Sequence, residues 1–190
     1  MELVTPSRRE LESCADALRH GWSPSTEHDV SQEVLDEIAA DADAFLATAD
    51  DRDPAGRTIT LPDGSVVPRL PSTVRWMWDG EFCGSINLRW QDGTVELPPH
   101  CLGHIGYSVV PWKRRLGYAT QALRDVLPLA REVGLPYVVI TTDPDNLGSQ
   151  RVIEANGGVL VRRFDKGPHY GGTVGLWYQV DLLGAPPGDV

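Results

Sequence analysis

The sequence predicts an α/β (α+β) fold in a single domain, with a mixed central sheet, antiparallel N-terminal strands and flanking helices. Two observations support this prediction. The first half carries strand-like stretches joined by a tight turn, and in the second half strand and helix patterns alternate. A length of 190 residues fits one domain. We assign this domain to residues 1–183 and expect residues 184–190 to form a flexible tail.

Two amphipathic helices are predicted before the strands. Ser7 and Glu10 have the spacing of a capping box at the start of the first helix. Apolar residues recur on one helical face from Ser31 to Leu46, which predicts a second helix. Residues 50–71 are rich in Asp, Pro and Gly, and we expect a loop with a small hairpin around Asp63–Gly64.

Strands follow. Residues 73–78 and 81–90 flank Asp79–Gly80, a strong hairpin signal, and residues 104–110 form a third strand. The apolar period then becomes helical from Gly117, and Pro128 is expected to kink or interrupt this helix because it lacks a backbone donor. The remaining predicted elements are a buried strand at 137–142, a short helix from about 147 to 156, and strands at 159–163 and 176–182.

Composition excludes several classes of function. There are 17 basic and 27 acidic residues, and a net charge of −10 disfavours nucleic acid as a partner. No apolar run reaches the roughly 20 residues that cross a membrane, and the N-terminus lacks a secretion signal, so we expect a cytoplasmic protein. The three cysteines are scattered and form no CxxC pair, which predicts neither a disulfide framework nor a metal site.

The turn before the long helix has the features of a pyrophosphate site. Amide groups at a helix start lack internal partners, and the helix dipole adds about half a positive charge there. Gly117 and Ala119 are small enough for a ligand to approach the backbone. Lys113, Arg114 and Arg115 bring positive charge beside it. The turn is therefore predicted to bind phosphates, although it fits neither the dinucleotide fingerprint nor the P-loop pattern.

The same segment resembles a known family. The pattern Val-x-Pro-x-x-Arg-Arg-x-Gly-Tyr-Ala, at residues 109–119, resembles the acetyl-CoA pyrophosphate motif of the GNAT superfamily of N-acetyltransferases. Residues 143–158 resemble the second signature of that family, in which Asn-x-x-Ser/Ala precedes an aliphatic-rich helix ending in glycine. Residues 103–109 resemble the corresponding segment of an uncharacterised bacterial branch of this family. The resemblance covers roughly residues 73–182.

This resemblance implies how acetyl-CoA is bound. The amides from Arg115 to Thr120 would hold the pyrophosphate, the strand end would pair with the pantetheine arm, and two central strands would splay to admit the thioester. Two residues of the second signature would contact the arm from the opposite side. The implied cofactor-binding residues are Val109, Val110, Arg114, Arg115, Leu116, Gly117, Tyr118, Ala119, Thr120, Asn146 and Ser149.

Two residues are candidates for the general base. His104 opens the strand beside the expected thioester, and an ordinary histidine pKa near 6.5 suits proton transfer. The alternative is a hydrogen-bonded structural histidine. Asp143, at the end of the buried strand, is the second candidate, and its alternative roles are to cap the next helix or to brace the loop.

The acid that protonates the departing thiolate is missing from its usual place. Many family members use a tyrosine seven residues after the asparagine, and this position is Ile153. Ser149, Tyr107, Tyr118 or an ordered water are the alternative proton donors. A mechanism without protonation is a further alternative, since a thiol with a pKa of about 8.5 is already a fair leaving group.

The resemblance implies an N-acetyltransferase that moves an acetyl group from acetyl-CoA to a primary amine of a small molecule by direct attack. The acidic surface favours a cationic acceptor. Two alternatives stay open. One is an acetyl-CoA-binding sensor without turnover, suggested by Ile153, and the other is a protein or peptide N-acetyltransferase. A homodimer is compatible with each of these three functions.

Overall fold

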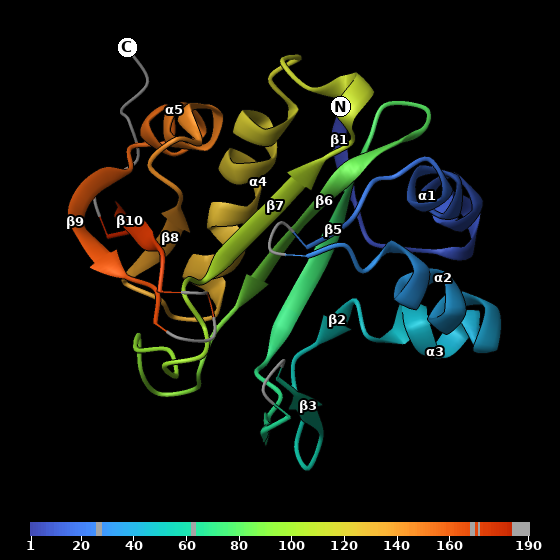
Figure 1. The fold of residues 1–190 in the computed structure, drawn as a ribbon, viewed down its shortest axis with the longest axis horizontal. Helices are drawn as coiled ribbons and strands as arrows, with labels where there is room; N and C mark the ends of the chain where they lie inside the picture. Colours follow the sequence, from blue (N-terminus) through green and yellow to red (C-terminus); the bar gives the residue numbers. More distant parts are fainter. Residues whose placement is uncertain (26–27, 62–63, 168–169, 171, 184–190) are drawn as a thin grey trace.

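The computed structural model describes residues 1–25, 28–61, 64–167, 170 and 172–183. The predicted tail at 184–190 lies outside these residues. In Figure 1, helices α4 and α5 lie on one side of strand β7, and α1, α2 and α3 lie on the other. The elements are β1 Glu2–Val4, α1 Arg8–Arg19, α2 Ser31–Ala40, α3 Ala42–Ala47, β2 Asp50–Asp51, β3 Thr58–Thr60, β4 Val66–Pro68, β5 Ser72–Trp78, β6 Phe82–Arg89, β7 Ile105–Val109, the 3-10 helix η1 Pro111–Lys113, α4 Tyr118–Glu132, β8 Tyr137–Thr142, α5 Leu147–Glu154, β9 Val159–Asp165 and β10 Val174–Asp181.

The strands form two main sheets and the small β3–β4 hairpin rather than the one mixed sheet expected. The larger has the order β1-β5-β6-β7, with β2 paired to β5, and the smaller has the order β8-β10-β9. The amide of His104 donates to the carbonyl of Val139 at 2.8 Å, which joins the start of β7 to β8. Beyond this bond the two strands run in the same direction without forming a ladder (Figure 1). A gap in the backbone pairing therefore opens toward their carboxyl ends.

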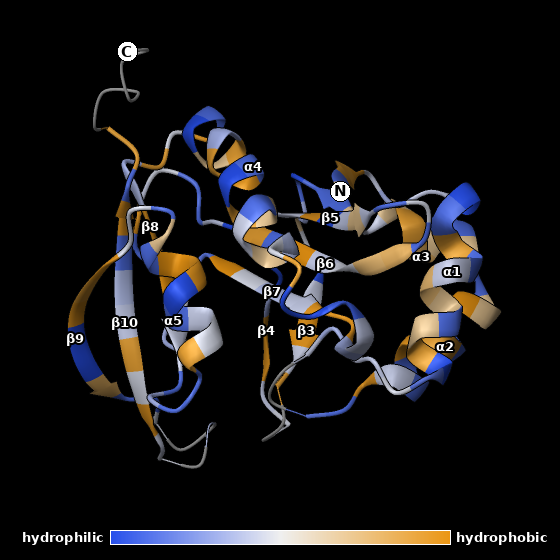
Figure 2. Cartoon of the chain, turned by 90° about the horizontal axis from the view of Figure 1, so that it is seen from above, coloured by the Kyte–Doolittle hydropathy of each residue, from blue (hydrophilic) through white to orange (hydrophobic). Residues whose placement is uncertain are grey.

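Side-chain alternation divides the larger sheet into two faces. In β6, Ile86 and Leu88 are fully buried in the cluster that includes α4, β8 and β10. Ser85 and Asn87 alternate with them and point to the opposite face. On that face α1 packs against Trp76 and other apolar residues in a second cluster. Figure 2 shows hydrophilic and hydrophobic residues alternating along α1 and α4, as expected of helices buried on one side only.

The two predicted hairpins are present. β5 and β6 pair in antiparallel register across Asp79–Gly80, and β3 pairs with β4 in the long loop. Asp63, assigned to the second turn, lies outside the described residues. Gly84 in β6 has a φ of +142°, and a Cβ there would lie 2.2 Å from the carbonyl oxygen of Ser108. Only glycine therefore allows β6 to approach the end of β7 this closely.

The helix expected from 31 to 46 was wrong in extent, and of the two effects expected of Pro128 the interruption is absent while the kink stays a prediction. The expected helix from 31 to 46 is divided into α2 and α3 by Asp41, which has an extended backbone and accepts hydrogen bonds from the amides of Asp43 and Ala44 at 3.0 Å. An aspartate that caps a new helix competes with continuation of the old one. Conversely, α4 continues through Pro128 without interruption. Pro128 is exposed, so water can satisfy the carbonyl that its missing donor leaves free.

Candidate functional site

The turn between β7 and α4 presents a row of unpaired amide groups. Arg115 and Gly117 both have left-handed backbones, with φ of +69° and +81°, and Gly117 is the N-cap of α4. None of the amides from Arg115 to Thr120 donates to an acceptor among the described residues. A Cβ on Gly117 would meet no atom within 4 Å, so the turn is open on that side. Such a row of donors at a helix N-terminus suits a phosphate group.

The positive side chains near this turn are not equivalent. Arg114 and Arg115 are exposed, and neither forms an ion pair with a described residue. The Nε atom of Arg114 donates to the carbonyl of Val109 at 3.3 Å, which holds the guanidinium between the strand end and the turn. Both arginines are therefore free to face an anion.

Lys113 does not add free charge, contrary to the sequence-based expectation. Its Nζ atom lies 2.7 Å from a carboxylate oxygen of Asp79 and 2.6 Å from one of Glu81. Burial lowers the pKa of Lys113, but these two hydrogen bonds outweigh it and leave the pKa above its usual value. Tyr118 also donates to Asp79, so the β5–β6 hairpin anchors both ends of the turn. Asp79 was interpreted only as a hairpin residue, and nothing in the local sequence indicates this second role.

At the end of β7, the backbone groups of one edge of the strand point toward the gap between β7 and β8. The amide of Val110 donates to the carbonyl of Cys83 in β6 at 3.0 Å, and Val110 is fully buried. The amide of Val110 is therefore not available as a donor to a ligand, and its predicted contact with the pantetheine arm stays a prediction. Backbone donors in a strand alternate between its two edges, so the amide of Val109 faces away from β6. The role of Val109 stays a prediction.

The second signature segment lies against the first. Asn146 is the N-cap of α5 and accepts a hydrogen bond from the amide of Ser149 at 3.0 Å. At the other end of α5, the side-chain amide of Asn156 donates to the carbonyl of Thr120 at 3.1 Å and so ties α5 to the first turn of α4. Asn156 thus contacts the segment that carries the amide row, a contact that the sequence-based interpretation missed. Ligand contacts of Asn146 and Ser149 stay predictions.

A tyrosine from β7 bridges the gap to α5. The hydroxyl of Tyr107 lies 2.8 Å from the hydroxyl of Ser149. Ile153, one turn further along α5 at the usual tyrosine position, is fully buried in the core. Burial raises the pKa of Tyr107 to about 12, although its hydrogen bond with Ser149 opposes the shift. The phenol therefore keeps its proton at neutral pH and is the best placed of the substitutes considered for the missing acid.

His104 has a structural role in this arrangement. Its Nδ1 atom accepts a hydrogen bond from the amide of Val139 at 2.9 Å, which requires the proton to be on Nε2. Nε2 in turn donates to the carbonyl of Val95 at 3.1 Å. The residue is 1% exposed, and burial, helped by the charge of Arg89, lowers its pKa to about 4. With both nitrogens occupied, His104 has no lone pair for an incoming amine, so we withdraw it as the base.

This role predicts how folding stability depends on pH. The unfolded chain protonates His104 near pH 6.5, whereas the folded chain does so only near pH 4, so stability is full above pH 6.5 and falls as the pH drops between these values. The shift corresponds to about 3 kcal/mol of unfolding free energy. Urea unfolding of the wild type and of His104→Gln across this range should show a shallower pH dependence in the variant. Parallel profiles, or a kinetic pKa near 6.5 that the variant removes, would restore the base assignment.

Asp143 lies away from His104 rather than beside it. It follows β8 by one residue, four positions beyond Val139, which places it about 13 Å further along the strand direction. Its carboxylate lies 2.6 Å from the Nζ atom of the buried Lys166, which follows β9. The structure therefore does not combine the two candidate bases in one site. Asp143 stands at the open end of the gap and keeps an accessible carboxylate, since its side chain is 48% exposed.

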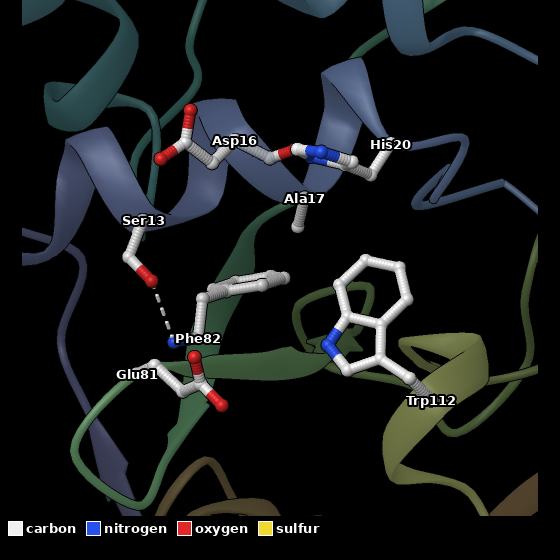
Figure 3. Close-up of a pocket in the computed structure, with 7 residues that line it drawn as sticks. All are labelled: Ser13, Asp16, Ala17, His20, Glu81, Phe82 and Trp112. Atoms are coloured by element: carbon white, nitrogen blue, oxygen red, sulfur yellow. Dashed lines mark hydrogen bonds between the residues drawn. The ribbon is translucent and has the colours of Figure 1, made fainter.

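Two hollows are present, one against the smaller sheet and one beside the larger sheet. One, of about 430 Å³, lies under the loop from Val95 to Leu102 and is also lined by His104, Val139, Lys166 and Trp177. The other, of about 410 Å³, lies between α1, the start of β6 and η1, where His20, Phe82 and Trp112 face it (Figure 3). In the described part of the chain, no helix is long and apolar enough to cross a membrane, and no three potential metal ligands cluster.

A strand that leads to an amide-lined helix start, beside a second diverging strand, is typical of the class of α/β proteins that bind phosphorylated ligands. Comparison makes this class specific. Residues 26–159 match the model of the acetyltransferase (GNAT) domain, and the chain belongs to this family. The resemblance recognised in the sequence and the expected GNAT-like fold are thereby confirmed. No curated protein sequence matches the chain.

Solved acetyltransferase structures share the fold at low sequence identity. The microcin C7 self-immunity acetyltransferase MccE, bound to acetyl-CoA and AMP, is 12% identical, with 94% of this chain and 91% of that chain covered and a TM-score of 0.59. RimL, a ribosomal alpha-N-protein acetyltransferase with coenzyme A, is 12% identical, with 94% and 92% covered and a TM-score of 0.59. A variant of spermidine N-acetyltransferase SpeG from Vibrio cholerae is 9% identical, with 96% and 95% covered and a TM-score of 0.57.

Proposed function

We propose that this chain is an N-acetyltransferase that transfers the acetyl group of acetyl-CoA to a primary amine of a small molecule. The observation that supports it most directly is the row of unpaired amides from Arg115 to Thr120 at the start of α4. The open side of Gly117 and the free charges of Arg114 and Arg115 fit a pyrophosphate there. Structural neighbours with acetyl-CoA or coenzyme A bound add support.

Each described group has a proposed task in the transfer. Acetyl-CoA supplies the acetyl group as a thioester. The amide of Val109, which faces the gap, donates to the pantetheine arm, and Asn146 and Ser149 contact the arm from α5. In the reaction the amine nitrogen bonds to the carbonyl carbon, the carbon–sulfur bond breaks, and the nitrogen loses a proton to Asp143 or to solvent. The sulfur takes a proton from Tyr107, which recovers one from Ser149 or water.

The test separates binding from turnover. Isothermal titration with acetyl-CoA is expected to show one site per chain, and release of free thiol is then followed with a panel of amines that includes spermidine, amino acids and short peptides. Turnover with small amines supports the proposal, and turnover confined to peptides favours a protein acceptor. Tight binding without acetyl transfer to any amine would identify a sensor. Absence of acetyl-CoA binding would refute the assignment altogether. Homodimerisation and a cytoplasmic location also stay predictions.

A further inference from the structure

Arg89, the last residue of β6, is a partly buried cation that forms no ion pair with a carboxylate of the described residues. Each of the other arginines and lysines that is at least partly buried in the described part of the chain forms an ion pair, namely Arg69, Arg75, Lys113 and Lys166. Holding a charge away from water without an opposite charge is costly. Among the described basic residues that are at least partly buried, Arg89 therefore stands apart in a way that calls for an anionic ligand.

Neutral groups hold the Arg89 guanidinium in place. Its Nη2 atom donates to the side-chain oxygen of Asn87 at 3.1 Å, and Nη1 lies 3.8 Å from the sulfur of Cys101. The same Asn87 oxygen accepts from the amide of Gly106 at 2.8 Å, so the asparagine is itself fixed by β7. A guanidinium carries five donors in a planar fork that matches a carboxylate. The described contacts leave most of these donors for a ligand.

The guanidinium lies over the start of β7, on the face of the larger sheet that points away from α4. Asn87 and Gly106 are directly opposite in the β6–β7 register, and a Cβ on Gly106 would lie 3.4 Å from Nη2 of Arg89. Gly106 precedes Tyr107, and successive side chains in a strand point to opposite faces. Arg89 and the phenol of Tyr107, which is proposed to protonate the departing sulfur, thus lie on opposite faces of β7. Arg89 itself does not line the 430 Å³ hollow, but its neighbours Cys101 and His104 do.

We infer that the acceptor is an amine that also carries a carboxylate, and that Arg89 binds this carboxylate so that the amine reaches the gap beside Gly106. The inference rests on the proposed function and names the substrate class of the same site. His104, which is neutral and hydrogen-bonded through both nitrogens, does not compete for the anion. This inferred acceptor replaces the cationic acceptor expected from the net charge of −10. Net charge acts on a ligand over long distances, whereas the choice of acceptor depends on the charged group that it meets in the site, here Arg89.

The experiment compares matched amines on the full chain. L-alanine and L-phenylalanine are each tested against the corresponding carboxamide and decarboxylated amine, and 2-aminoethyl phosphate is tested against ethanolamine. A charge-assisted bidentate pair predicts kcat/KM about 10- to 100-fold higher for the anionic member. Arg89→Met should remove this preference by slowing only the anionic amines, and Arg89→Lys should retain part of it. A higher kcat/KM for 2-aminoethyl phosphate than for the amino acids would contradict the carboxylate and indicate that Arg89 binds a phosphate.

Arg124→Met is the matched control, since it removes the same charge from an exposed position on α4. It should leave the preference unchanged. Equal rates for charged and neutral amines, or an Arg89→Met loss that is the same for every amine, would overturn the inference. If no amine is turned over, N-acetylphenylalanine and its amide are titrated into the enzyme saturated with coenzyme A. Acid-selective binding that depends on Arg89 supports the inference, and its absence refutes it, whereas failure of coenzyme A itself to bind refutes the proposed function.

Discussion

Replacing Gly117 by glutamate is expected to raise the dissociation constant of acetyl-CoA about 100- to 1000-fold. The new carboxylate would project from the N-cap of α4 into the open space beside the unpaired amides, where the phosphates are proposed to bind. Two like charges about 4 Å apart near a protein surface repel by about 4 kcal/mol, and each 1.4 kcal/mol corresponds to a tenfold change in affinity. Isothermal titration with acetyl-CoA measures the effect directly.

Gly134→Glu is the matched control, which distinguishes the effect of the new negative charge from the effect of backbone strain. Gly134 follows the other end of α4, has a φ of +84°, and likewise has no atom within 4 Å of the point that a Cβ would occupy. Both glycines therefore impose the same left-handed strain of roughly 1–2 kcal/mol on glutamate. Only the Gly117 variant should lose affinity, while thermal unfolding shows a similar small decrease in both. Equal affinity losses, or none in either, would show that the amide turn does not bind the phosphates.

The amide turn could be predicted from sequence because it depends on consecutive residues. The first amides of a helix that begins after Gly117 have no partners within the helix, and Gly117 indicates this helix start in the sequence. The tight hairpin at Asp79–Gly80 was predictable for the same reason. Local chemistry therefore indicated the phosphate-binding element and the order of strands and helices.

Roles that depend on distant partners were not predictable. His104 is bound by the amide of Val139, 35 residues away, and this contact converts a candidate base into a structural link. Lys113 loses its free charge to Asp79, 34 residues earlier. Neither separation leaves a pattern in the sequence. The gap between β7 and β8 was implied by the family resemblance, but not by the pattern of either strand, since each strand separately has the pattern of an ordinary member of one sheet.

The missing acid illustrates the same limit. Ile153 showed that the usual tyrosine was absent, but the sequence alone did not rank the substitutes. The structure brings Tyr107 and Ser149 within 2.8 Å although they are 42 residues apart. A hydroxyl supplied from β7 rather than from α5 reaches the first turn of α5, one turn before Ile153. We thus propose that the proton donor to the sulfur lies near its usual place, although its side chain comes from β7 instead of α5.

Tyr107→Phe is accordingly expected to lower kcat about 100-fold while the dissociation constant of acetyl-CoA changes little. General acid catalysis by a positioned group contributes about 100- to 10,000-fold, and we expect the lower end because a thiolate leaves readily. Because burial raises the pKa of Tyr107 to about 12, the phenol stays protonated as the pH rises, and the loss should be constant between pH 6 and 9. Steady-state kinetics across this range, together with titration of acetyl-CoA, tests both expectations.

Tyr178→Phe is the matched control for this variant. Tyr178 is also buried, and its hydroxyl also donates to α5, to a carboxylate oxygen of Glu154 at 3.2 Å. It points into the core rather than across the gap, so its loss should affect thermal stability without a comparable effect on kcat. A similar kcat loss in both variants would mean that the hydroxyls act by holding α5. A Tyr107→Phe enzyme with nearly normal kcat would mean that the sulfur departs without an acid, because a thiol pKa of about 8.5 already makes it a fair leaving group.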